Sequence, residues 1–347
     1  MNLFTVSRSS LDGAVQRMIE DSVVYGVKRK PPRYAFDRLF ESQELCLDYD
    51  ISLLPPTRYL LPPSETLLRY RLAPQSEVSA VTEQTPAVVI GIHPFDLHAV
   101  KLLNKVFADD QHDGNYMARR NRTALIGVDC LNPWQYGFAA SMGTAVPPDY
   151  FYDLWLTDLG DDYLVDVGSS KGQELRSRYL PAATEARDGQ ARKREQLREE
   201  ARQKYQLSLD ISPPEIARLL ARDEVWQSGL WKELGDKCFS CGSCTMVCPT
   251  CICFDVRDRM DLGQSQGERY RTWDSCMFLG FARVASGENF RESGEARLRH
   301  RLHRKGKYML ERYGELGCVG CGRCVHACLV DIASPVYAFN TLAREVK

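Results

Sequence analysis

The sequence has no excess of charge of either sign and no apolar run long enough to cross a bilayer. Its 347 residues include 45 lysines and arginines and 46 aspartates and glutamates, a formal net charge of −1. Balanced charge gives no field that would attract nucleic acid or an anionic membrane. The first residues also lack the basic-then-apolar pattern of a secretory signal. We therefore expect a cytoplasmic protein with no membrane span and no nucleic-acid partner.

Phosphate-binding loops are absent as well. Residues 87–92 read as a buried strand, and Pro94 then begins a helix that runs to about Phe107. This strand–turn–helix has the shape of a nucleotide site, but neither G-x-G-x-x-G nor G-x-x-x-x-G-K-[ST] occurs. In the turn, we expect His93 to be a surface or packing residue. We expect Asp96 to accept hydrogen bonds from the first helical turn.

Cysteine is scarce in the first two thirds of the chain and abundant after it. Eleven of the thirteen cysteines lie from Cys238 onward. Without an export signal, so many cysteines indicate metal binding and not disulfides. Two runs share the spacing C-x2-C-x2-C-x3-C. The first run is Cys238, Cys241, Cys244 and Cys248, and the second is Cys318, Cys321, Cys324 and Cys328.

This spacing is the ligand pattern of two-cluster ferredoxins. Three cysteines at two-residue gaps wrap one [4Fe–4S] cube, and the fourth reaches the other cube. We expect one cluster on Cys238, Cys241, Cys244 and Cys328, and the other on Cys318, Cys321, Cys324 and Cys248. Structural zinc sites use two cysteine pairs and fit less well. A radical S-adenosylmethionine pattern at Cys244, Cys248 and Cys251 would leave the second run unexplained.

Three cysteines, Cys251, Cys253 and Cys276, lie outside both runs. Two interpretations stay open for them. They hold part of a third cluster, completed by Cys46, Cys130 or a side chain other than cysteine. Alternatively, they are reduced thiols buried beside the two clusters, because free cysteine is among the most buried residue types.

The remaining patterns predict an α+β protein in three parts. Further strands are expected at residues 123–128, 153–157 and 163–167, whereas 34–40 and 67–72 suit a short helix or a strand. We assign residues 1–190 to an α/β docking domain of uncertain role and 191–235 to a charged helical linker. Residues 236–347 are expected to form an α-helical ferredoxin-like domain with two [4Fe–4S] clusters.

A basic helix is predicted between the two runs, at residues 295–312. Three interpretations apply to its charges: a solvated face, which we expect, a docking surface for an acidic partner, or a positive field that raises the reduction potential of a nearby cluster. The basic residues are Arg297, Arg299, His300, Arg301, His303, Arg304, Lys305 and Lys307.

The stretches from Cys238 to Asp255 and from Arg271 to Cys276, followed by the second run, resemble a known family. They are similar to the β subunits of sulfhydrogenase-type soluble NiFe hydrogenases and to the related iron–sulfur subunits of anaerobic sulfite reductases. The chain departs from that family at Phe95 and near Ala139, where relatives often have cysteine. Leu329 also stands where proline usually follows the last cysteine of such a run.

The resemblance implies a non-catalytic electron-transfer subunit of a hetero-oligomer. Its two [4Fe–4S] clusters would relay electrons between a flavin subunit that binds NAD(P)H and a catalytic metalloenzyme subunit. That partner would be a NiFe hydrogenase or, next, a sirohaem-type sulfite or sulfur reductase. Two alternatives are a regulatory redox-sensing iron–sulfur protein and an enzyme with a third cluster at Cys251, Cys253 and Cys276. No residue is expected to act as a catalytic acid, base or nucleophile.

Overall fold

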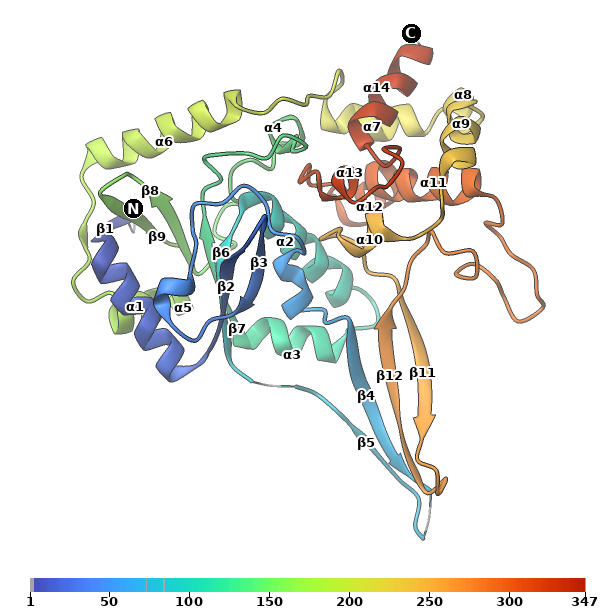
Figure 1. Ribbon diagram of the computed structural model, residues 1–347, viewed down its shortest axis with the longest axis horizontal. Coiled ribbons are helices and arrows are strands. Elements are labelled where there is room, and N and C mark those ends of the chain that lie inside the picture. The colour runs from blue at the N-terminus through green and yellow to red at the C-terminus, as the bar shows by residue number, and fades with distance from the viewer. Residues whose placement is uncertain (1–2, 73, 84, 347) are drawn as a thin grey trace.

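The computed structural model describes residues 3–72, 74–83 and 85–346. Residues 1, 2, 73 and 84 of the first predicted domain and residue 347 of the last lie outside the described residues. Within them the chain forms a large mixed sheet with helices around it, a second and narrower sheet, and a group of C-terminal helices (Figure 1). The predicted α+β class is confirmed.

The first sheet has eight strands in the order β10-β1-β9-β8-β7-β6-β2-β3. Its centre, β2-β6-β7-β8, is parallel, and antiparallel strands extend it on both sides. Strands β6 and β7 are almost wholly buried, as apolar strands in the parallel part of a sheet usually are. The strands are β1 (Leu3–Ser7), β2 (Val23–Lys30), β3 (Arg33–Arg38), β6 (Ala87–Ile92), β7 (Thr123–Val128), β8 (Leu154–Asp158), β9 (Asp162–Val167) and β10 (Thr184–Glu185).

Five helices surround this sheet, and the helix predicted after β6 is confirmed as α2. Helix α1 contacts α5, whereas α2 contacts α3 and also reaches the C-terminal helix α12 (Met309–Tyr313). The charged helix α6 lies against β9, where Arg194 pairs with Asp166, and Arg198 pairs with Asp129 at the end of β7. The helices are α1 (Arg8–Asp21), α2 (Pro94–Ala108), α3 (Gly114–Arg122), α5 (Ser170–Tyr179) and α6 (Asp188–Gln203), with 3-10 turns at Ser42–Glu44 and Pro56–Tyr59.

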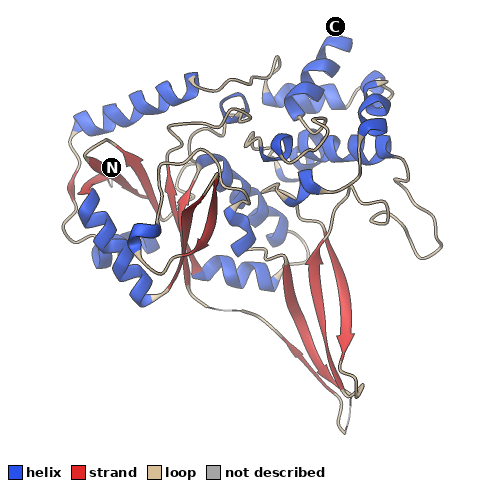
Figure 2. Cartoon of the chain, in the orientation of Figure 1, coloured by secondary structure: helices blue, strands red, loops and turns tan. Residues whose placement is uncertain are grey.

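The second sheet forms an arm that projects from the body of the molecule (Figure 2). Its four antiparallel strands, in the order β11-β12-β4-β5, come from segments far apart in the chain. Strands β4 (Ser64–Arg71) and β5 (Glu77–Ala80) precede the first cysteine run, whereas β11 (Phe254–Met260) and β12 (Gln266–Trp273) lie between the two runs. The arm therefore joins the two halves of the sequence.

The C-terminal part is helical, as predicted. Helix α11 continues through a π-helical turn, Arg304–Tyr308, into α12. Apolar side chains of α7, α9, α11 and α14 form a second hydrophobic core, which includes Trp231 and Phe339. The helices are α7 (Pro213–Leu220), α8 (Asp223–Trp226), α9 (Leu230–Lys237), α10 (Ser243–Met246), α11 (Gly294–His303), α13 (Arg323–His326) and α14 (Pro335–Glu345). The short helix α4 (Ala139–Met142) comes from the front of the chain, and its Met142 packs in the same core.

The predicted division into three parts stays a prediction. Within the predicted linker, α6 packs on the first sheet, and α7 to α9 pack with the C-terminal helices. A small apolar cluster that includes Phe95, Cys130 and Ala139 from the front of the chain also contains Val319 and Cys321 from the back. Contacts between front and back are therefore built into the fold at this cluster as well as at the arm.

Candidate metal centre

The eight cysteines of the two runs surround two cavities. Four thiols line the first cavity: Cys238, Cys241, Cys244 and Cys328. Four others line the second cavity: Cys248, Cys318, Cys321 and Cys324. Each cavity takes three cysteines from one run and the last cysteine of the other, which is the grouping predicted from the spacing. Four soft sulfur donors around one enclosed space suit a [4Fe–4S] cluster. That these thiols are the ligands stays a prediction.

The two loops repeat one local structure. Gly242 and Gly322 adopt left-handed backbone conformations, with φ of 73° and 79°, and each precedes a one-turn helix, α10 or α13. A Cβ at Gly322 would lie 2.3 Å from the carbonyl oxygen of Tyr136, and one at Gly242 would lie 2.5 Å from the ring of Phe278. Glycine is therefore required at both positions by the backbone and by the space. Helices α10 and α13 contact each other, which brings the two runs together.

The first cavity is apolar and reaches the surface. Apart from its four thiols and Gly242, it is lined by apolar side chains, among them Met277 and Leu298. Cys241 is exposed, and two other lining residues, Phe239 and Leu329, are 68% and 78% exposed. A hydrogen bond with Ser243 lowers the pKa of Cys241. This cavity could therefore hold a cluster close to solvent.

The second cavity has more deeply buried cysteines, and two cations line it. Cys321 and Cys324 are buried, and burial raises the pKa of Cys321 to about 12. Arg301 and Lys305 line the same cavity, although they are only 2% and 4% exposed. The Lys305 ammonium donates to the Thr250 hydroxyl at 2.6 Å, and Thr250 lies 3.3 Å from the Cys248 sulfur.

The expected solvated face of the basic helix is therefore wrong for part of it. Arg297, Arg301, His303 and Lys305 are buried. Residues 298, 301, 302 and 305 share one helix face, so the apolar positions Leu298 and Leu302 already indicated which side faces inward. The sequence shows these cations as a basic stretch, but only the packing shows that two of them face cysteines.

The expected role of Asp96 is also wrong, whereas that of His93 as a packing residue is confirmed. Asp96 is fully buried and forms two hydrogen bonds with the Arg323 guanidinium, at 2.6 and 2.7 Å. Arg323 lies between Cys321 and Cys324, so this pair fixes helix α2 to the second cysteine loop. Burial raises the pKa of Asp96, and the Arg323 charge opposes that rise. His93 is buried and stacks on Tyr49 with ring centroids 4.0 Å apart.

The three remaining cysteines of the back half lie next to the second cavity. Cys251 and Cys253 line a small hollow with Cys248 and Asp274. The Cys276 thiol hydrogen-bonds to Cys253, and this contact lowers the pKa of Cys253. A similar hydrogen bond between Cys251 and Cys248 lowers the pKa of Cys248.

The suggested cysteine partners of this trio lie elsewhere. Cys46 and Cys130 do not line the hollow. The Cys46 thiol donates to the carbonyl oxygen of Asp48 at 3.2 Å, and Cys130 packs in the apolar cluster with Phe95 and Cys321. All thirteen cysteines are free thiols. In the described ranges, no three His, Cys, Asp or Glu side chains are grouped to hold a single metal ion.

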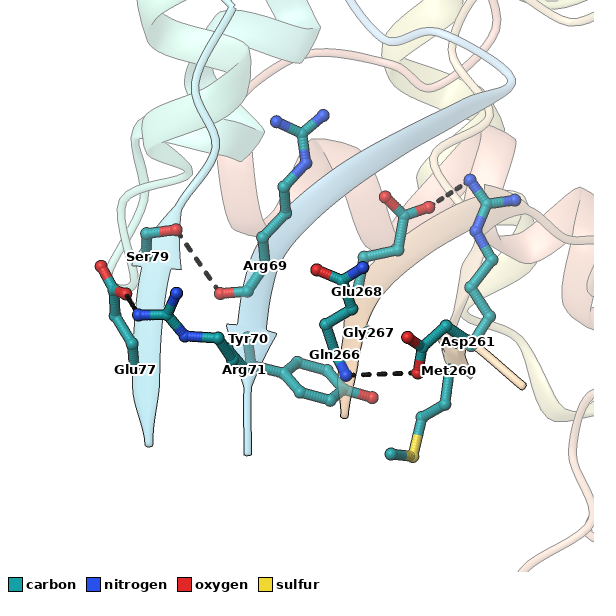
Figure 3. Close-up of a pocket in the computed structure, with 11 residues that line it drawn as sticks. Arg69, Tyr70, Arg71, Glu77, Ser79, Met260, Asp261, Gln266, Gly267 and Glu268 are labelled. Carbon is teal, nitrogen blue, oxygen red and sulfur yellow. Dashed lines mark hydrogen bonds and ion pairs between the residues drawn. The ribbon is translucent and has the colours of Figure 1, made fainter. Parts of the chain in front are cut away.

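A larger hollow lies on the arm, and its lining differs from that of the two cysteine cavities. It has a volume of about 500 Å³ and is lined by residues of all four arm strands, such as Arg69, Tyr70 and Gln266 (Figure 3). Two of its arginines are paired within the arm: Arg71 binds Glu77 at 2.6 Å, and Arg259 pairs with Glu268. It contains no cysteine, so the candidate metal centre is the pair of cavities between the C-terminal helices.

Comparison with known proteins agrees with this location. The family model of a 4Fe-4S dicluster domain matches residues 237–332, which include all eight cysteines of the two runs. A dicluster domain carries two [4Fe–4S] clusters. Sulfhydrogenase 2 subunit beta of Pyrococcus furiosus is 33% identical to the chain over 312 residues, which cover 90% of each protein. None of the helices in the described part of the chain combines the length and hydropathy of a membrane span.

Proposed function

Since this chain belongs to the family of sulfhydrogenase β subunits, we propose that it relays electrons between two other subunits of a cytoplasmic oxidoreductase. It is an iron–sulfur electron-transfer subunit. We further propose that one partner is a flavin subunit that oxidises NAD(P)H and that the other is a catalytic metalloenzyme. A NiFe hydrogenase is our first choice for that enzyme, and a sirohaem-type sulfite or sulfur reductase is our second.

The observation that carries this proposal is the pair of adjacent four-cysteine cavities, one with an exposed cysteine and one with buried cysteines. Cys241 and its neighbour Phe239 are exposed at the first cavity, whereas Cys321 and Cys324 of the second are buried. Electrons can therefore be exchanged with a partner at the first cavity and passed inward. A [4Fe–4S] cluster supplies reversible one-electron transfer, and the protein supplies ligation, burial and charge.

In this proposal, the ligands are Cys238, Cys241, Cys244 and Cys328 in the first cavity and Cys248, Cys318, Cys321 and Cys324 in the second. The chain's own contribution is to fix these thiols and to exclude water from the second cavity. No side chain in either cavity is needed as a proton donor or as a nucleophile. The chain alone should therefore not turn over a substrate.

The test is to coexpress the chain anaerobically with the proteins encoded beside it. A relay predicts a complex that contains a flavoprotein and a metalloenzyme, with NAD(P)H reducing the EPR-active clusters of this chain. Cys241→Ser and Cys321→Ser should each remove one cluster signal and stop electron flow, while the flavin subunit still oxidises NAD(P)H with an artificial acceptor. An isolated monomer that associates with neither partner would instead favour the redox-sensing alternative.

A further inference from the structure

The two cavities differ in the charge that surrounds them. Among the residues that the structure describes, no charged side chain lines the first cavity. The second cavity is lined by the guanidinium of Arg301 and the ammonium of Lys305. Both cations belong to the continuous helical segment formed by α11 and the π-helical turn, which passes between the cysteine runs in the sequence. The same helix therefore lines the second cavity with two positive charges.

No carboxylate neutralises either cation among the ion pairs of the described residues. Lys305 donates to the neutral Thr250 hydroxyl, whose own proton goes to the Gly317 carbonyl oxygen at 2.5 Å. Arg301 reaches only the Ala333 carbonyl oxygen, at 3.4 Å, and its Nε has no hydrogen-bond partner. Arg323, by contrast, is neutralised by Asp96. A buried cation without an anion is strongly unfavourable, so these two charges need the negative charge of the thiolates and of what they bind.

The two cations have different neighbours. Lys305 lines the second cavity, and its ammonium reaches the Cys248 sulfur through the Thr250 hydroxyl, at 2.6 and 3.3 Å. Arg301 also lines the second cavity, but it contacts Ala333 at 3.4 Å, and Ala333 lines the first cavity. Lys305 therefore acts on the second cavity, and Arg301 acts on both.

We propose that Lys305, assisted by Arg301, holds the group bound in the second cavity at a higher reduction potential than the group bound in the first. This inference rests on the two-cluster relay proposed above. Each electron taken up adds one negative charge, and a fixed cation a few ångströms away stabilises that charge strongly where water is excluded. Water near Cys241 also favours the reduced state of the first group, but only along one exposed edge, whereas the buried Lys305 charge acts on the second group in full.

The consequence is that, at equilibrium, a single electron is found mainly on the group in the second cavity. One electron that enters at the exposed first cavity is lost there and gained at the second, where it rests next to Lys305. A partner that withdraws electrons from the second cavity must therefore have a still higher potential. The group in the apolar first cavity has the lower reduction potential, and electrons enter the chain there.

The test is an EPR-monitored redox titration of the full chain, purified anaerobically, in Lys305→Met, Arg301→Met and Lys307→Met. Lys307 is the matched control, because it lies on the same helical segment but pairs with Glu311 at 3.8 Å. We expect Lys305→Met to lower the reduction potential of the group that gives one of the EPR signals. The equilibrium constant for electron transfer between the two groups should change by about tenfold or more. That signal should be the one missing in Cys321→Ser. Arg301→Met should lower both potentials, and Lys307→Met neither.

Iron content and charge-preserving variants make the result decisive. Lys305→Arg should restore most of the shift, which a purely structural role of the lysine would not do. Unchanged potentials in Lys305→Met with full iron content would overturn the proposal, as would a shift confined to the signal missing in Cys241→Ser. If Lys305→Met does not retain iron, the same comparison is made between Lys305→Gln, which removes the charge, and Lys305→Arg, which keeps it. Unchanged potentials in Lys305→Gln would then overturn the proposal. Because the titration needs no partner, a chain with these potentials that binds no flavin subunit would refute the relay alone.

Discussion

The carboxylate of Asp96 and the guanidinium of Arg323 are joined by two hydrogen bonds, at 2.6 and 2.7 Å, and both side chains are buried. Asp96 lies in the first turn of α2, which packs on the first sheet, and Arg323 lies inside the second cysteine loop. Arg323 also donates to the carbonyl and the hydroxyl oxygen of Ser52 at 2.9 Å. The front of the chain thus sets the position of the loop that carries Cys321 and Cys324.

Asp96→Asn should destabilise the protein strongly, because it leaves the buried Arg323 charge without an anion. Removing one partner of a buried ion pair costs about 3–5 kcal/mol. Denaturant unfolding under anaerobic conditions would measure this loss. Asp210→Asn is the control: Asp210 pairs with Arg344, whose side chain is 67% exposed, and such pairs contribute about 0–1 kcal/mol. Equal losses in both variants would contradict a special role for the buried pair.

Serine substitutions should group the cysteines by cavity and not by run. Cys328→Ser should remove the same EPR signal as Cys238→Ser, although the two residues belong to different runs. Cys248→Ser should likewise match Cys318→Ser. If Cys328→Ser instead removes the signal lost in Cys318→Ser, the cross-shared arrangement is wrong.

His93 should make the protein less stable as the pH falls below neutrality. Burial lowers the pKa of His93 from 6.5 to about 4. Between these two pH values, the unfolded chain therefore binds a proton at His93 and the folded chain does not. The stability is complete above the unfolded pKa and decreases as the pH falls from 6.5 toward 4. From pH 6.5 to about pH 5.5, this amounts to about 1 kcal/mol.

His93→Gln should remove this share of the pH dependence, as measured by denaturant unfolding at both pH values. His300, whose pKa is also lowered to about 4 by burial, would keep its own contribution. The wild type and the variant are therefore compared by the difference between their slopes. Identical slopes would show that His93 does not titrate in this range.

Gly322→Ala should disturb the second cysteine loop and reduce its iron loading. Gly322 has a φ of +79°, and a Cβ there would lie 2.3 Å from the Tyr136 carbonyl oxygen. Gly314→Ala is the matched control, because Gly314 has a φ of +71° but no atom within 4 Å of the added Cβ. Strain in the left-handed region alone costs about 1–3 kcal/mol, so only Gly322→Ala should also lose iron. Full iron content in both variants would contradict the required close approach.

Cys276→Ala should leave the iron content unchanged. Cys276 and Cys253 form a mutually hydrogen-bonded pair, and Cys276 is buried, which suits reduced thiols that pack beside the metal centre. Iron and acid-labile sulfide analysis of the anaerobic protein would test this. A wild type with more iron than two cubes, reduced to two cubes in the variant, would instead establish a third cluster.

Much of the core could be predicted from the sequence, because local patterns determine it. The apolar runs of β6 and β7, the proline at the start of α2 and the cysteine spacing all carry their own signal. The cross-shared cavities follow from that spacing as well, since a fourth cysteine three residues on turns away from its own loop.

The interactions that join distant segments could not be predicted in this way. Strand β12 pairs with β4 across most of the chain, and Arg271 of β12 is buried against Glu65 of β4 and Asp113. A single sequence does not show which charged residues will form ion pairs across such distances in the chain. For the same reason, local patterns predict a helix cap at Asp96 and a solvated Lys305, and the packing of distant segments overrides both.

The crossing of the two runs also constrains how the protein can be made. In the proposed arrangement, the first cavity has only three of its four sulfurs until Cys328 has been synthesised, and the second cavity has only Cys248 until the second run has been made. Cofactor insertion must therefore follow translation of almost the whole chain, including the arm between the runs. A nascent or prematurely terminated polypeptide would expose thiols with no complete cage, which makes anaerobic handling and the timing of iron delivery decisive for recovering active material.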